Sequence, residues 1–145
     1  MTALSYITAG IMFLIAALHF LWGVGVYWPA ENETSLARAV VGARDIAFMP
    51  SFLACAFVAA CLGIGIVIVL RLGGVMEIGF LPLWLFKLAG AGLAFVFLSR
   101  GIVGFLPFWA EMTPEEPFRT FDKRYYSPLC LALGLAVRRL IFALR

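Results

Sequence analysis

The feature that most constrains this chain is the stretch from Ser51 to Leu70, which is apolar and contains no charged side chain. A helix of that length reaches about 30 Å, which is the thickness of the hydrocarbon core of a bilayer. Hydrophobic residues make up 64% of the 145 residues and charged residues only 13%, which is too apolar for a single soluble core of this size. The composition excludes a soluble enzyme, a disordered tail and a disulfide-stapled secreted domain.

Three further apolar segments extend over about 3–27, 78–98 and 128–145. Together with 50–70 they predict four transmembrane helices. The first segment has no basic residue before it and ends on aromatic Tyr27-Trp28, so we expect a retained span rather than a signal peptide. In the fourth, Ser127-Pro128 is typical of an N-cap and a first helical residue, and its length of about 18 residues is just enough to cross the hydrocarbon.

The connections over about 31–45 and 108–126 are long enough to hold structure of their own. In the first, Thr34-Ser35 is a candidate N-cap and Gly42 lies near a candidate helix end. In the second, the segment Thr113 to Glu116 has the spacing of a capping box. Both connections are therefore predicted to contain short amphipathic helices on one face of the membrane.

The predicted fold is one all-α, polytopic membrane domain over residues 1–145. Four spans place both termini on the side opposite the two structured connections, and the short segment from Arg71 to Gly79 is expected to be a simple turn on the terminal side. Basic residues are almost equally divided between the two sides, so the positive-inside rule does not decide the orientation. Because the acidic residues gather in the two long connections, we expect cytoplasmic termini.

Six short motifs spread over most of the chain carry a family resemblance: His19-x-x-Trp22-x-x-Gly25-x-x-Trp28-Pro29, Val40-Val41-Gly42, Met49-Pro50, Arg100-Gly101-x-x-Gly104, Pro117-Phe118 and Tyr126-Ser127-Pro128-Leu129-Cys130-Leu131. In these motifs the chain resembles a family of small bacterial membrane proteins known as domain of unknown function 3995. The resemblance implies a bacterial, four-helix integral membrane protein, and it implies no activity. We expect the protein to lie in the bacterial inner membrane. The pair Arg138-Arg139 is not part of the resemblance.

His19 is the only histidine, and it lies about 12 Å inside the Trp28 end of the first span. Ionisable side chains within a membrane are candidates for function, and Asp45, Arg44 and Arg100 are expected to approach His19 from the same side. A histidine held by a carboxylate beside an arginine can act as a general base toward a lipid head group or bind an anionic ligand. The simpler alternative is a neutral imidazole that hydrogen-bonds across helices and fixes their packing.

Lys87, Arg138 and Arg139 form a second candidate group. They are expected at similar depth on the terminal side, where no carboxylate lies within the spans. One interpretation is a pocket for lipid phosphate or cardiolipin between the third and fourth spans, and the other is snorkelling of long side chains to the interface.

No cofactor, metal or nucleic acid is expected from the sequence. A bis-histidine haem needs a second histidine, and Cys55, Cys61 and Cys130 lie in apolar segments, where they are expected to be small buried hydrophobic residues. The chain contains no phosphate loop, dinucleotide-binding fingerprint or metal motif.

Two functions follow from these observations. The first is a bundle without catalytic activity that binds membrane lipids or protein partners, either as a homo-oligomer or within a larger membrane complex. The alternative is a membrane enzyme that acts on an amphiphilic substrate through His19 with Asp45 and Arg100. A proton-coupled exporter like the small multidrug resistance proteins is not favoured, because the first span carries no carboxylate.

Overall fold

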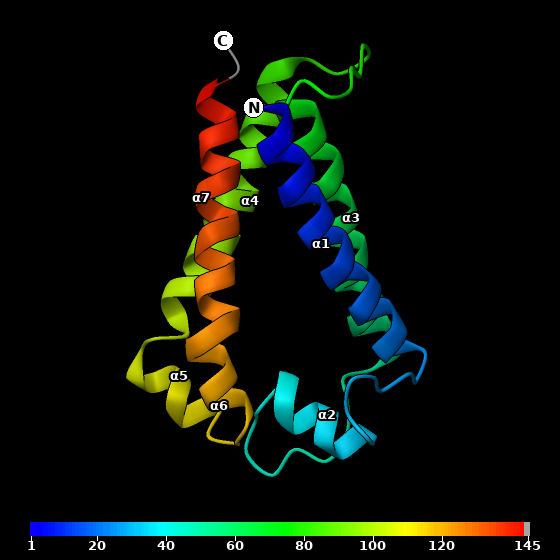
Figure 1. The fold of residues 1–145 in the computed structure, drawn as a ribbon, viewed down its shortest axis with the longest axis vertical. Helices are drawn as coiled ribbons and strands as arrows, with labels where there is room; N and C mark the ends of the chain where they lie inside the picture. Colours follow the sequence, from blue (N-terminus) through cyan, green and yellow to red (C-terminus); the bar gives the residue numbers. More distant parts are fainter. Residues whose placement is uncertain (144–145) are drawn as a thin grey trace.

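The computed structural model describes residues 1–143, which form helices joined by loops (Figure 1). Four helical segments are long and apolar enough to cross a membrane, which confirms the predicted all-α, four-span class. They are α1 (Thr2–Gly23), α3 (Phe52–Leu72), α4 (Leu83–Val103) and the continuous segment Phe118–Ala143. The last segment consists of α6 (Phe118–Phe121), the π-helical turn η1 (Asp122–Tyr126) and α7 (Ser127–Ala143).

The long helices are arranged as two pairs, α1 with α3 and α4 with α7 (Figure 1). The pairs meet near the end that carries the N-terminus, which we call the terminal end. They diverge toward the opposite end, the loop end, where α2 (Glu33–Val40) lies between them. The second connection carries α5 (Pro107–Met112) and α6 beside the base of the α4–α7 pair.

Small residues allow the helices to approach closely. A Cβ atom added to Gly134 of α7 would lie 2.7 Å from Cγ of Leu98 on α4, and one added to Gly65 of α3 would lie 2.5 Å from Cε of Met12 on α1. Within a membrane, association of helices depends on such close van der Waals packing, because lipid tails are as apolar as the side chains. Glycine at these positions therefore fixes which helices pair.

Two boundaries differ from the predicted spans because of proline. The second long helix begins at Phe52, since the hydroxyl of Ser51 caps it by accepting the Ala54 N–H at 3.3 Å, and Pro50 precedes the cap. The third begins at Leu83, directly after Pro82, rather than at residue 78. A residue that precedes proline is biased away from helical geometry, which excludes the segment before Pro82 from the helix. Because α4 extends to Val103, Arg100 lies inside its last turn.

The fourth span shows that the predicted N-cap at Ser127 is wrong. Ser127 is buried within a continuous helical segment of 26 residues, and its hydroxyl donates to Asp122. Pro128 has no N–H and cannot make the α-helical bond to the preceding turn, and the wider turn η1 directly precedes it. At 1.5 Å per residue the segment measures about 39 Å, which is ample to cross the hydrocarbon.

The caps of the short helices also differ from prediction. The side chain of Asn32, rather than Thr34 or Ser35, caps α2 by accepting the Ser35 N–H at 2.9 Å. Thr113 ends α5 instead of opening a capping box, because its hydroxyl donates to the carbonyl of Trp109 at 2.7 Å. The connection between α3 and α4 runs from 73 to 82 and is longer than the simple turn that we expected.

Candidate functional site

A cavity of about 610 Å³ lies between the two helix pairs near α2. Its size falls within the range of small-molecule sites, about 300–1,000 Å³. Three of its lining side chains, those of His19, Arg100 and Tyr126, are strongly polar. The remaining lining residues are apolar or present aromatic and sulfur-containing side chains: Ile15, Leu18, Trp22, Val40, Val41, Met49, Pro50, Cys55, Val58, Leu62, Phe97, Phe118, Leu129, Cys130 and Leu133.

His19 offers a hydrogen-bond acceptor to this cavity. Its Nδ1 lies 2.8 Å from the carbonyl oxygen of Ile15 on the same helix. Because a carbonyl only accepts, we assign the proton of the neutral ring to Nδ1, which leaves a lone pair on Nε2. Over residues 1–143 no hydrogen bond to Nε2 is found, and the ring packs against Trp22 with centroids 5.2 Å apart. The imidazole thus bonds to its own helix rather than across helices.

Arg100 is held by a polar cluster at the base of α4. Its Nη2 lies 2.7 Å from Oδ1 of Asp122, and its Nη1 donates to the hydroxyl of Ser127 at 3.3 Å. The guanidinium also stacks on Trp109, with Cζ 5.1 Å from the ring centroid. The Arg100 side chain keeps 31% of its surface exposed, whereas that of Asp122 keeps 2%. The arginine therefore bridges a buried anion and the cavity.

Asp122 has donors on both carboxylate oxygens. Besides Arg100, the Ser127 hydroxyl donates to Oδ1 at 3.0 Å and the indole N–H of Trp109 donates to Oδ2 at 2.9 Å. The cluster is compact because Gly104 has no side chain, and a Cβ there would overlap the Ser127 hydroxyl. A buried carboxylate is tolerated when it is paired and hydrogen-bonded in this way. Asp122 was not predicted as a partner from sequence, and the one available signal was an acidic residue among aromatic residues three and four apart, Phe118, Phe121 and Tyr125.

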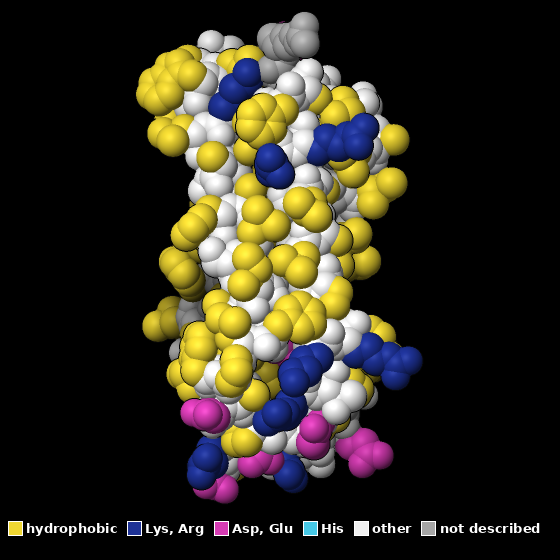
Figure 2. Space-filling model, turned by 90° about the vertical axis from the view of Figure 1, so that its left-hand side faces the viewer, with side chains coloured by type: hydrophobic (Ala, Val, Ile, Leu, Met, Phe, Trp, Pro, Cys, Tyr) yellow, Lys and Arg dark blue, Asp and Glu magenta, His cyan; other side chains and the backbone are white. Residues whose placement is uncertain are grey.

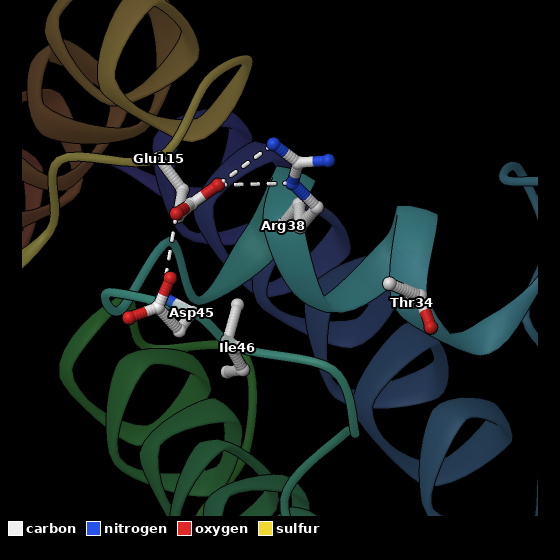
Figure 3. A pocket seen from close by; sticks show the side chains of 5 residues that line it. All are labelled: Thr34, Arg38, Asp45, Ile46 and Glu115. Atoms are coloured by element: carbon white, nitrogen blue, oxygen red, sulfur yellow. Dashed lines mark hydrogen bonds and ion pairs between the residues drawn. The ribbon is translucent and has the colours of Figure 1, made fainter.

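Asp45 lies outside this cavity. It is exposed in the loop after α2, and its backbone N–H donates to Oε1 of Glu115 at 3.3 Å. Oε2 of the same carboxylate pairs with Arg38 at 2.8 Å, around a second pocket of about 300 Å³ that Thr34 and Ile46 also line (Figure 3). The structure thus brings His19 and Arg100 to one cavity, but it places Asp45 elsewhere. The carboxylate beside Arg100 is Asp122.

Three contacts besides those of the Glu115 carboxylate fasten α2 and its loop to the second long connection, α6 and η1. The Tyr126 hydroxyl donates to the carbonyl of Ala39 at 3.1 Å, and the Glu115 N–H donates to the carbonyl of Gly42 at 3.2 Å. The ring of Phe118 covers the backbone of Gly42, which has a φ of +68°. These contacts join the two helix pairs across the loop end and form one wall of the cavity.

The second predicted group lies near the terminal end, away from the cavity. Lys87 is half-buried in the second turn of α4, and Arg138 and Arg139 are exposed on α7. Arg138 stacks on Phe142, with Cζ 5.9 Å from the ring centroid. The structure thus places these three cations at one end of the α4–α7 pair.

The cysteines are free thiols, and only Cys55 is fully buried. Cys130 is partly exposed, and Cys61 is exposed on the outer face of α3, contrary to the expectation of burial. Within the described part of the chain, no group of three histidine, cysteine or acidic residues could hold a metal ion.

The family model described as Protein of unknown function (DUF3995) matches residues 12–137. The chain belongs to this family. The match covers most of the chain and ends before Arg138-Arg139. No curated protein and no solved structure matches the chain. The family description assigns no activity to this DUF3995 chain.

Many residues of the motifs that resemble the family lie in the wall of the cavity. They come from both helix pairs and both long connections: His19, Trp22, Val40, Val41, Met49, Pro50, Arg100, Phe118, Tyr126, Leu129 and Cys130. Segments far apart in the sequence therefore meet at one place, and we treat this cavity as the candidate functional site.

Proposed function

We propose that this membrane protein binds an amphiphilic, lipid-like molecule in the cavity between its two helix pairs, with an uncharged hydroxyl head near His19 and Arg100. The observation that carries the proposal is an apolar cavity that contains one arginine and one histidine acceptor, which has no partner among residues 1–143. An apolar wall with a few convergent polar groups is typical of ligand sites.

The charge of the cluster favours an uncharged head group. The positive charge of Arg100 is balanced by Asp122 at 2.7 Å, so the pair is neutral overall. A hydroxyl both donates and accepts, so it can donate to Nε2 of His19 and accept from a guanidinium N–H of Arg100. The Tyr126 hydroxyl uses its proton for Ala39, so its oxygen can only accept from a ligand, and His19 is the group that accepts within reach of Arg100 as a donor.

The proposal is tested by native mass spectrometry of the detergent-purified protein with three probes: 1-hexadecanol, hexadecanoate and phosphatidylglycerol. We expect wild type to retain the alcohol in preference to hexadecanoate, and we expect changes in the cavity to alter retention of the alcohol but not of phosphatidylglycerol. His19→Phe removes the acceptor and should weaken alcohol binding about tenfold, the effect of one lost hydrogen bond in an apolar site. Val58→Trp should occlude the cavity.

Phe20→Leu is the matched control, because residue 20 follows His19 but is exposed, with 52% of its surface accessible. Its affinity for the alcohol should equal that of wild type. Equal retention of the alcohol by all four proteins, or absence of a bound probe from wild type, would overturn the proposal. Preference for hexadecanoate would indicate that the head group of the ligand is a carboxylate and not a hydroxyl.

Catalysis on the same ligand is the second candidate function, and the shared cavity of His19 and Arg100 favours it. In this version the Nε2 lone pair of His19 acts as general base toward the hydroxyl. Asp45 has no contact with this cavity, so Asp122 replaces it as the carboxylate partner of Arg100. His19→Gln separates the two candidates, because glutamine is a hydrogen-bond acceptor but not a base. If the His19→Gln variant still binds the ligand but no longer converts it, the result would support catalysis.

We further propose that the protein lies in the bacterial inner membrane with cytoplasmic termini. Among described residues Arg71, Lys87, Arg138 and Arg139 lie near the terminal end, whereas all carboxylates except Glu77 belong to the two long connections. A cysteine-free background with Glu31→Cys or Glu77→Cys tests the orientation. A membrane-impermeant maleimide should label residue 31 in intact spheroplasts and residue 77 only after permeabilisation. The reverse pattern would invert the orientation.

A further inference from the structure

Three helices meet at one point near the terminal end, and each contributes a basic residue there. A Cβ added to Gly90 of α4 would lie 2.7 Å from Cδ1 of Leu72 on α3 and 3.3 Å from Cγ1 of Ile141 on α7. Arg71 is adjacent to Leu72, Lys87 lies three residues before Gly90, and Arg138 lies three residues before Ile141. Each basic residue therefore lies within about one helical turn of the same junction.

The ion pairs found over residues 1–143 are Arg38–Glu115 and Arg100–Asp122, both at the loop end. Figure 2 shows the same contrast on one face of the molecule. Lys and Arg side chains stand without Asp or Glu near the upper, terminal end, whereas both signs mix near the lower end. The three basic residues of the junction thus have no carboxylate partner within the described part of the chain.

Arg71 is the distinctive member of this group. Its Nε is buried without a hydrogen-bond partner, and no other buried side-chain nitrogen or oxygen of the described residues lacks one. Its Cζ lies 5.8 Å from the ring centroid of Phe86 on α4, so the guanidinium is held against the ring. A buried donor without a partner costs free energy, and a charged donor costs more. The two terminal nitrogens of the guanidinium are not buried in this way, so a phosphate oxygen can reach them.

We propose that Arg71, Lys87 and Arg138 form a site for the phosphate group of an anionic lipid at the junction of α3, α4 and α7. Guanidinium groups bind phosphate through two parallel hydrogen bonds, and a lysine ammonium adds a point charge. Lipid phosphates lie at the ends of spanning helices, and Lys87 is in the second turn of α4. The site is separate from the His19 cavity, and its test is independent of that proposal.

Arg139 supplies a matched control on the same helix. Gly134 and Ile141 face α4, and the helical period places Arg138 on the flank of that face. Residue 139 is rotated by about 200° from residue 141, so it points away from the junction. Arg138→Leu and Arg139→Leu remove the same charge at almost the same depth, but only the first removes a ligand of the proposed site.

The experiment reconstitutes wild type and variants in nanodiscs that contain phosphatidylcholine with a minor fraction of phosphatidylglycerol. Native mass spectrometry then measures the phosphatidylglycerol retained after extraction into detergent. Arg71→Leu and Lys87→Leu should each reduce retention about tenfold, the effect of a lost charge-assisted hydrogen bond. Arg138→Leu should reduce it less because Arg138 is exposed, and Arg139→Leu should leave it unchanged. Arg71→Lys keeps the charge and should restore part of the binding.

If Arg138→Leu and Arg139→Leu lose equal amounts of phosphatidylglycerol, the lipid is attracted by the basic surface in general, and the proposal of a defined site would be overturned. Unchanged retention in Arg71→Leu and Lys87→Leu would overturn it as well. If the Arg71→Leu variant fails to insert into the membrane, the Lys87→Leu and Arg71→Lys variants provide the test instead. Displacement of the lipid by inorganic phosphate at millimolar concentration would assign the site to free phosphate instead.

Discussion

At the loop end Arg38 and Arg100 each meet a carboxylate, whereas at the terminal end Arg71 stacks on a ring and its Nε has no partner in the described part of the chain. Both ends hold basic side chains, and α4 carries one near each of its ends, Lys87 and Arg100. The difference lies in the connections, because the long ones at the loop end carry most of the acidic residues and fold back against the helices.

This contrast indicates that the two ends are held together by different forces. At the loop end, ion pairs and hydrogen bonds reach from one connection to the other and leave a cavity between the helix pairs. At the terminal end, apolar contacts such as Leu72 with Gly90 and Ile141 bring the helices together. The cavity and the polar contacts therefore occur at the same end, where apolar packing between the helix pairs is least complete.

The largest effect is expected from Asp122→Ala, which leaves Arg100 without its partner. Removing one member of a buried ion pair costs about 3–5 kcal/mol, and the partial exposure of Arg100 places the expected loss in the free energy of unfolding near the lower figure. Reversible unfolding in mixed micelles, followed by circular dichroism, measures this loss.

The double variant Arg100→Met/Asp122→Leu is the control for that prediction. Replacing both charges with apolar residues of similar volume is often neutral, so this variant should recover much of the lost stability. A double variant as unstable as Asp122→Ala would indicate that packing, and not the unpaired charge, determines the loss.

The next effect compares two glycines with the same φ of +68°, Gly42 at the loop end and Gly74 at the terminal end. Alanine at either position is strained by about 1 kcal/mol in this conformation. At Gly42 its Cβ would also overlap the ring of Phe118, whereas at Gly74 it would meet no atom of the described residues within 4 Å. Gly42→Ala should therefore lower the free energy of unfolding by about 2 kcal/mol, because overpacking adds about 1 kcal/mol to the strain.

Equal effects at the two glycines would contradict tight docking of the first connection on Phe118. The same unfolding measurement provides this test. Limited proteolysis adds a local readout, since Gly42→Ala should expose the loop after α2 to cleavage while Gly74→Ala should leave that loop protected.

The smallest effect is expected for Arg38→Ala. The Arg38 side chain is 51% exposed, and surface ion pairs contribute about 0.2–1 kcal/mol. Its loss should be measurable at low ionic strength and should vanish in high salt, because salt screens exposed charges. A salt-independent loss above about 1 kcal/mol would mean that this pair resembles Arg100–Asp122 and that the loop end is held more rigidly than its exposure indicates.

The spans were predictable from sequence because apolar length is a local property. The boundaries of the spans were less predictable. The third helix begins at Leu83, directly after Pro82, and Pro128 falls within a continuous helix instead of starting one. The N-cap predicted at Ser127 is wrong because the helical segment already begins at Phe118, and the Ser127 hydroxyl donates to Asp122 in the preceding turn while it accepts from Arg100 of α4 at 3.3 Å. Capping patterns read locally cannot show that a serine is buried against another helix.

The candidate site was predictable in part. His19 and Arg100 stood out because ionisable residues are rare in apolar segments, and they do line one cavity. Asp45 was expected beside them from topology alone, but Asp122 occupies that place. Arg71 was read as the end of a span, and its lack of a partner appears only once Phe86 is seen to cover it.

By itself the sequence determined that the chain folds in lipid, as four apolar helices with two structured connections on one side. These properties follow from residue type and length, which act locally. Tertiary structure decided which carboxylate meets Arg100, where the cavity lies and which cations remain without partners. Those outcomes depend on close approach at positions such as Gly104, where the absence of one Cβ admits Ser127 and Asp122 and brings together residues more than twenty positions apart.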